Sequence, residues 1–344
     1  LVDRFSIPFL NKFGSRRSWV ILMQIIIIFG LLVLSRINPL SSFNIFAFVA
    51  FTIAFAGSVQ DIAIDALRIE SAKLEDQGNL AAGYQLGYRL AILVGSSLAL
   101  ILAENTSWSY VYQSMSIFMA LNIVLCILTS YENENIILKK LSLEETVSAP
   151  LEDFFGRFGT QMACILLLIV ATYRLTDIVM GPMANPFYLD MGYTLSEIGA
   201  VIKVVGLIFA MAGVFVGGIF IKKIGLYKSL LIGAIFVMCT NLCFSYASIN
   251  DKSLFLLASI VGADSFAAGI VGTVNIAFLT SLVSKKYTGF QYALLTSLMA
   301  IIGKFFGGFS GVLVENLQSL YGFNYGWMSF YIFTSLLAIP AILM

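Results

Sequence analysis

Two carboxylates, Asp61 and Asp65, stand four residues apart within an apolar segment of the sequence. On a helix this spacing places both side chains on one face. Neighbouring carboxylates resist joint ionisation, so one of them is expected to hold a proton, as a proton carrier must. Arg89, in the next apolar segment, stands at about the same depth, roughly 13 Å from the shared end of the two segments. The alternative is structural: an Asp61–Arg89 ion pair, with Asp65 held by nearby arginines as part of a gate.

A second set of charges lies in the later apolar segments. Arg174, Lys203 and Lys304 fall in the same half of the membrane depth as one acid, Asp177. Three cations against one acid suit an anionic substrate. The alternative is internal pairing of Asp177 with Arg174 or Lys203. Asp264, in the middle of its own apolar segment, could neutralise a further cation or carry a proton.

The residue types exclude several other chemistries. The chain has no histidine, so imidazole metal sites and imidazole proton transfer are excluded, and proton chemistry must use carboxylates. The four cysteines lie within apolar runs without a C-x-x-C motif, which favours small core residues over ligands. There is no H-E-x-x-H or other hydrolase motif. We therefore expect neither enzyme activity nor a metal or cofactor.

The elements that position these charges are membrane-spanning helices. The chain is 59% hydrophobic and only 11% charged, whereas soluble domains are about 25% charged. Apolar runs long enough to span a bilayer, about 20 residues, recur along it. We expect ten spans, at 19–36, 43–67, 80–103, 110–130, 161–183, 196–221, 229–248, 254–282, 289–315 and 326–344.

The cations of the connectors predict the orientation. Of the 20 Lys and Arg residues, 14 lie in connectors on one side of the expected spans, and Arg36 and Lys252 lie on the other. By the positive-inside rule the richer side is cytoplasmic. The C-terminus and the polar connector 131–160 are therefore expected in the cytoplasm.

Two cytoplasmic connectors resemble each other, VDRFSIPFLNKFGSRRSW (2–19) and GGIFIKKIGLYKSL (217–230). They resemble the loop between helices 2 and 3 of the major facilitator superfamily and its copy between helices 8 and 9. Equal halves would then need two further helices before residue 1, giving an all-α membrane fold of twelve helices. The expected domains are 1–130 (helices 3–6), the linker 131–160 and 161–344 (helices 7–12). The expected cytoplasmic gate comprises Asp3, Arg4, Arg16, Arg17, Lys222 and Lys223.

Four segments carry a narrower resemblance, to the AmpG family of bacterial muropeptide permeases. They are SVQDIAIDALRIE (58–70), GYQLGYRLAILVGSSLALILAE (83–104), YRLTDIVMGPMANPFYLDMGYTLSEIGAVIKVVGL (173–207) and QYALLTSL (291–298). The resemblance implies proton-driven import of anhydro-muropeptides, which are anionic sugar-peptides, across the bacterial inner membrane. It puts Gln60, Asp61, Asp65 and Arg89 on matching positions, the last three for proton coupling.

In the superfamily the charge-bearing helices line a central cavity, which implies that the chain binds its substrate there. The expected substrate-binding residues are Gln60, Gln85, Tyr88, Arg174, Asp177, Lys203, Asp264 and Lys304. The expected partners are the lipid bilayer, the substrate and protons, without nucleic acid, for a chain that acts as a monomer. Two alternatives stay open: transport of another anion, such as acetyl-coenzyme A or a nucleotide, and a receptor of the same fold that does not transport.

Overall fold

The computed structural model describes residues 2–3, 5, 7, 10, 13–73, 76–128 and 145–343, and within these ranges the regular structure is helical throughout. The first helices are α1 (Ser15–Leu34), α2 (Phe43–Glu70), α3 (Gln77–Ile92), the π-helical segment η3 (Leu93–Leu98), α4 (Ala99–Asn105) and α5 (Trp108–Leu128). Then follow α6 (Glu145–Phe158), α7 (Thr160–Thr172), α8 (Leu175–Asp190), α9 (Leu195–Val201), the π-helical segment η4 (Ile202–Gly206) and α10 (Leu207–Ile224). The last are α11 (Leu226–Ala247), α12 (Leu254–Leu282), α13 (Thr288–Gly307), α14 (Ser310–Tyr321), α15 (Phe323–Leu336) and α16 (Ile339–Leu343).

Most of these helices are long and apolar enough to cross a membrane. Within the described ranges, nine helical stretches meet that requirement, and they coincide with nine of the ten predicted spans. The tenth predicted span, 80–103, lies within the unbroken helical run formed by α3, η3 and α4. Because hydrocarbon offers no hydrogen-bond partners, a spanning chain must satisfy its backbone within each helix. The chain is therefore a multi-pass membrane protein, as its composition predicts.

The chain forms two compact units. Unit 1 comprises Leu1–Lys73, Gly87–Asp153 and Val283–Ala293, and unit 2 comprises Leu74–Leu86, Phe154–Leu282 and Leu294–Met344. Helices α3 and α13 each contribute to both units. The predicted linker 131–160 contains the helix α6, which the sequence analysis did not anticipate, and residues 129–144 lie outside the described ranges.

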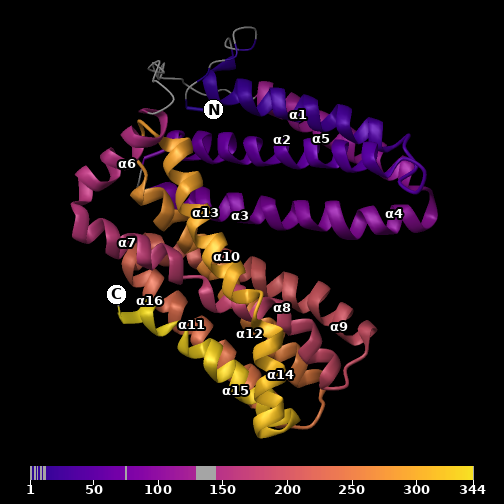
Figure 1. The fold of residues 1–344 in the computed structure, drawn as a ribbon, viewed down its shortest axis with the longest axis vertical. Coiled ribbons are helices and arrows are strands. Elements are labelled where there is room, and N and C mark those ends of the chain that lie inside the picture. Colours follow the sequence, from indigo (N-terminus) through magenta and orange to yellow (C-terminus); the bar gives the residue numbers. More distant parts are fainter. Residues whose placement is uncertain are drawn as a thin grey trace. The chain divides into compact units, whose positions relative to one another are not determined.

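In unit 1, α1 runs alongside α2 and α5 (Figure 1). Val20, Met23 and Ile27 of α1 form a buried core with Ala56 and Ala63 of α2. The two alanines let the α2 backbone come close to the larger α1 side chains, and this interdigitation supplies the packing that holds helices together in lipid.

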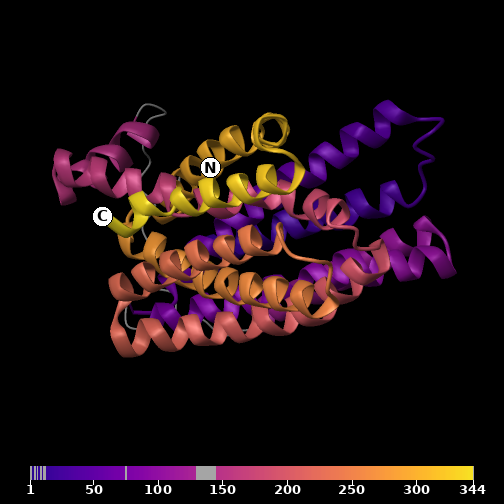
Figure 2. The ribbon, with the colours of Figure 1, turned by 90° about the horizontal axis from the view of Figure 1, so that it is seen from below.

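In unit 2, the centre is the close pair α10 and α12, which lie side by side in Figure 2. Gly213 and Gly269 form the contact. A Cβ at Gly213 would overlap the carbonyl oxygen of Phe266, and a Cβ at Gly269 would overlap that of Ala210. Small residues therefore let the backbones of these two helices come into direct contact.

At Gly83 and Gly87, in contrast, a Cβ would meet no described atom. These two glycines therefore make no comparably close contact with the described residues.

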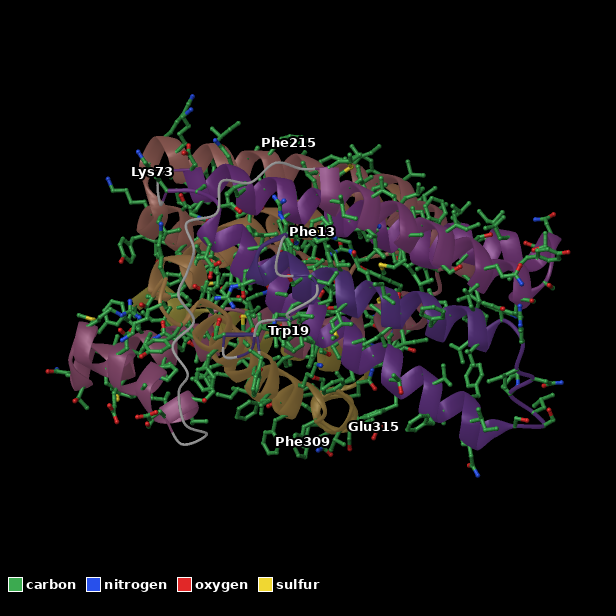
Figure 3. The ribbon with its side chains drawn as sticks, turned by 90° about the horizontal axis from the view of Figure 1, so that it is seen from above. Phe13, Trp19, Lys73, Phe215, Phe309 and Glu315 are labelled. Carbon is green, nitrogen blue, oxygen red and sulfur yellow. The ribbon has the colours of Figure 1, made fainter. Side chains whose placement is uncertain are left out.

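A cluster of aromatic rings fills the other end of unit 2. The Phe187 ring of α8 lies 5.3 Å from that of Trp327 and 5.0 Å from that of Tyr331, both in α15. The Trp327 indole N–H donates to the Asp190 carboxylate over 3.0 Å. Other large rings face outward, and Figure 3 shows the Phe215 and Phe309 side chains projecting away from the ribbon.

We expect Gly213→Ala and Gly269→Ala each to lower the stability of the protein by about 1–3 kcal/mol, because an added methyl group must push two backbones apart. The measurement is thermal unfolding of purified protein in one detergent. Gly181→Ala is the matched control. It adds the same methyl group at a helix position where no described neighbouring atom lies within 4 Å of the added Cβ. Equal melting temperatures for all three variants would contradict the close α10–α12 contact.

Candidate functional site

The two carboxylates of α2 differ in their surroundings. The Asp61 side chain is exposed and takes part in no ion pair within the described ranges. Asp65 is largely buried, and the Arg68 Nη2 atom lies 3.5 Å from its Oδ1 atom. The Arg68 guanidinium also lies 5.4 Å from the centre of the Tyr292 ring. Asp65 is thus held by an arginine, as the structural alternative predicts, whereas the predicted Asp61–Arg89 pair is not formed.

Polar groups on both sides of Asp61 in the sequence complete this part of the candidate site. The buried side-chain oxygen of Gln60 accepts no hydrogen bond within the described part of the chain. Tyr88 is mostly exposed, and Arg89 is half-buried four residues before the π-helical segment η3. The Gln85 amide lies against Gly272 of α12, so that a Cβ added at Gly272 would lie 2.8 Å from the Gln85 side-chain nitrogen. Such uncommitted amide and hydroxyl groups are what a sugar ligand requires.

The second charge set surrounds two irregular helices of unit 2. The helical run breaks between α7 and α8, where Arg174 caps α8, and its Nε atom lies 3.8 Å from Asp177 Oδ2 in the first turn. Internal pairing, the predicted alternative, therefore holds for Asp177 with Arg174 and not with Lys203. Lys203 lies within the π-helical segment η4, an irregularity that is frequent at functional sites.

Lys203 and Lys304 are the cations of this set that stay available. Both are exposed, and neither forms an ion pair with any described residue. Helix α13 comes close to α8 beside Lys304, because a Cβ at Gly303 would lie 2.5 Å from the Ile178 side chain. Lys304 therefore stands at the level of the Arg174–Asp177 pair along the two helices.

Asp264 lies inside unit 2, between four helices. The Thr240 hydroxyl of α11 donates to its carboxylate over 3.5 Å, and Tyr188 of α8 and Tyr331 of α15 are close enough for electrostatic interaction. The Tyr331 side chain is fully buried, and its hydroxyl has no hydrogen-bond partner within the described residues. Asp264 is therefore part of a polar cluster within the helix bundle. Its role in substrate binding stays a prediction.

The predicted gate centres on Arg16, at the start of α1. Its guanidinium lies 2.6 Å from the Asp3 carboxylate and 2.8 Å from the Glu70 carboxylate at the end of α2, and it donates to the Val2 carbonyl over 3.0 Å. The Arg16 side chain is 6% exposed and that of Glu70 only 4%. Among the described residues, one buried cation thus lies between two carboxylates.

Asp3 links this cluster to a third helix. Its carboxylate accepts the backbone N–H groups of Gly289, over 3.3 Å, and Phe290, over 2.7 Å, in the first turn of α13. The first N–H groups of a helix lack partners within it and carry partial positive charge, so a carboxylate is favoured there. Gln291 adds a further tie, because its amide donates to the Pro150 carbonyl of α6 over 2.8 Å.

The remaining predicted gate residues have different surroundings. Arg17 is half-buried beside Arg16, and Lys222 and Lys223 are exposed at the end of α10. Arg4 lies outside the described ranges. Glu70 is not among the predicted gate residues, because its only signal in the sequence is its place at the end of the 58–70 segment.

The two similar connectors share a backbone geometry. Gly14 and Gly225 both have positive φ, 95° and 86°, and each directly precedes a helix. Four residues later, the hydroxyls of Ser18 and Ser229 donate to the carbonyls of these glycines over 2.6 and 2.7 Å. The predicted repeat is therefore present at the level of the turn, where glycine supplies a conformation that other residues rarely adopt.

We expect Arg16→Gln to destabilise the protein by about 3–5 kcal/mol, because it leaves two buried carboxylates without their cation. Thermal unfolding in detergent measures the effect. Arg17→Gln, the adjacent substitution with the same change of charge, serves as the control and should cause a much smaller loss. A loss as large for Arg17→Gln would show that the cluster contributes no specific stability.

Comparisons with known proteins agree with this architecture. Residues 5–308 match the family model of the Major Facilitator Superfamily. The chain is 34% identical to the transporter AmpG 4 of Rickettsia conorii, over 99% of this chain and 81% of the relative. It is 32% identical to the Anhydromuropeptide permease of Escherichia coli K12, over 100% of this chain and 67% of the relative.

Among solved structures, the E. coli fucose:proton symporter FucP is similar in fold, with a TM-score of 0.69 and 14% identity over 97% of this chain and 85% of that one. The proton:xylose symporter XylE gives a TM-score of 0.70 at 14% identity, over 97% and 80%. The family match and the relatives along the whole chain together lead to one conclusion: this chain belongs to the major facilitator superfamily and, within it, to the AmpG transporters.

Proposed function

We propose that this protein imports anhydromuropeptides across the bacterial inner membrane and that protons moving down their gradient drive the import. The observation that carries the substrate is the likeness to the E. coli Anhydromuropeptide permease, which extends over the whole chain. The inner membrane, a cytoplasmic C-terminus and action as a monomer belong to the same proposal. The excess of Lys and Arg in the connectors of one side supports the orientation.

The charge distribution supports an anionic cargo. A muropeptide carries peptide carboxylates, and Lys203 and Lys304 are exposed cations without ion pairs in the described part of unit 2. An ammonium group without a partner inside a membrane protein is energetically unfavourable unless it serves a ligand or water. We assign these two lysines to the carboxylates of the cargo. Gln60, Gln85 and Tyr88 then contact its sugar hydroxyl and amide groups.

Asp61 is our candidate for proton coupling. When ionised, an exposed carboxylate repels an anionic cargo, and a bound proton removes the repulsion. Proton binding therefore strengthens cargo binding, and by reciprocity cargo binding strengthens proton binding. This mutual dependence is what symport requires. Asp65 is already paired with Arg68 and contributes by adding negative charge beside Asp61.

Transport then follows by alternating access, in which the two repeated halves rock about the bound cargo. We assign the Asp3–Arg16–Glu70 cluster to the cytoplasmic gate. It joins the start of α1, the end of α2 and the start of α13, so release of the Asp3 carboxylate from the α13 backbone accompanies opening on that side.

We expect Asp61→Asn to lose accumulation driven by a pH gradient, because an amide neither binds nor releases a proton in this range. Uptake of labelled anhydromuropeptide into proteoliposomes, with and without an imposed gradient, measures this loss. Exchange of cargo at equal pH should continue, since it needs no net proton movement. Asp251→Asn, in an exposed connector, is the control. Full gradient-driven accumulation by Asp61→Asn would refute the role of this carboxylate.

We expect Lys203→Gln and Lys304→Gln each to raise the KM for anhydromuropeptide by about tenfold or more, the size of one lost hydrogen bond to a charged group. The same variants should transport an analogue with amidated peptide carboxylates as well as the parent protein does. Lys228→Gln is the control, because it removes an exposed charge at the start of α11. It should change neither the KM for anhydromuropeptide nor the KM for the amidated analogue. Equal losses for the acid and the amide would show that the lysines do not bind carboxylates.

A further inference from the structure

A cavity of about 510 Å³ lies in unit 1, and its lining includes none of the residues assigned to the cargo. It lies where α1 ends at Leu34, α2 begins at Phe43 and α5 begins at Trp108, with the connector 35–39 forming part of its wall. The ends of apolar spanning helices mark the boundary of the bilayer. The cavity is therefore at the level where lipid headgroups meet hydrocarbon.

The cavity has one cationic lining residue, Arg36. It is the only Lys or Arg in the connector between α1 and α2. Its side chain is exposed, and it forms no ion pair with the described residues. Next to it, the Asn38 side-chain oxygen accepts the Leu40 N–H over 2.9 Å, which holds the connector in shape. Guanidinium is well suited to phosphate, because its fork of N–H groups can bind two oxygens.

Two aromatic residues of α5 also line the cavity. Trp108 and Tyr112 of α5 line the cavity with ring centres 6.2 Å apart, and the Trp108 side chain is 56% exposed. Tryptophan and tyrosine favour the membrane interface, because their apolar rings sit in the acyl region and their polar groups reach the headgroups.

Apolar surface adjoins the cavity on α2. Phe46 lines the cavity, and Phe43, three residues earlier on the same side of the helix, is 69% exposed. A wholly polar ligand would leave these rings uncovered, whereas a hydrocarbon chain would cover them. The occupant that matches both walls is amphipathic, with an anionic head at Arg36 and an acyl chain along α2.

We propose that this cavity binds an anionic phospholipid through its headgroup phosphate. Arg36 holds the phosphate, Trp108 and Tyr112 lie beside the glycerol region, and Phe46 contacts an acyl chain. The site is separate from the cargo site, and it does not depend on which substrate the protein transports.

Native mass spectrometry of the purified full chain, delipidated and then titrated with phosphatidylglycerol, tests the proposal. We expect Arg36→Gln to weaken binding at this site by about tenfold or more, and Arg36→Lys to retain part of it. Lys252→Gln is the matched control, because Lys252 is the other connector cation of this side and is already paired with Glu197 at 2.9 Å. It should bind phosphatidylglycerol as the parent protein does.

Two further arms identify the ligand. Inorganic phosphate at millimolar concentration should not displace the lipid, and Trp108→Ala should weaken lipid binding without loss of folded protein. Unchanged lipid affinity in Arg36→Gln would overturn the proposal. Displacement by inorganic phosphate would also overturn it, because the site would then recognise the anion without the acyl chain. Lipid loss in Arg36→Lys equal to that in Arg36→Gln would show that the guanidinium fork, and not positive charge alone, holds the phosphate.

Discussion

Hydrocarbon provides neither hydrogen bonds nor solvation for charge, and this constraint underlies the placement of nearly every polar group in the chain. The backbone satisfies it by forming helices. Several charged side chains, within the apolar segments or beyond their ends, satisfy it by pairing: Arg16 lies between Asp3 and Glu70, Arg68 lies beside Asp65, and Arg174 lies beside Asp177. The partners in each pair lie close together in space, even where they are far apart in the sequence.

Against this background, the charges that remain unpaired among the described residues stand out. Asp61, Lys203 and Lys304 are exposed and form no ion pair there. Pairing removes the energetic penalty of a charge but also removes its capacity to bind a ligand. The candidate residues therefore fall into two groups. The paired ones stabilise the helices, and the unpaired ones can respond to cargo or protons.

Irregular helix geometry accompanies several of these charges. Arg174 stands at the break between α7 and α8, and Lys203 lies within a π-helical segment. A break or a π turn frees backbone carbonyl and N–H groups, which is acceptable at membrane depth only where protein or water can bond them. Such sites thus imply polar surroundings around Arg174 and Lys203, which agrees with their assignment near an anionic cargo.

Much of this organisation could be predicted from the sequence. The features that could not be predicted have one cause in common. The spans can be predicted from the lengths of the apolar runs, because the thickness of the bilayer sets the length of each run independently of the rest of the chain. The contacts of the Asp3–Arg16–Glu70 cluster could not be predicted. Glu70 is 54 residues from Arg16, and the α13 backbone that donates to Asp3 lies still further along the chain. Nor does any residue pattern around Lys203 indicate a π turn. Pairing and irregularity depend on how helices pack, whereas the spans depend only on what each segment contains.

The two similar connectors show how a structural motif and a charge function can be separated. Both contain a glycine with positive φ followed, four residues later, by a serine that bonds back to it, so the turn is a shared feature of the repeat. Only the first connector also carries the acid and the buried arginine that bind α2 and α13. The turn alone suffices to reverse the chain at the membrane surface. The charge cluster is therefore found with the first connector only. It ties the start of α1 to the end of α2 and the start of α13 through contacts that the second connector has no residues to reproduce.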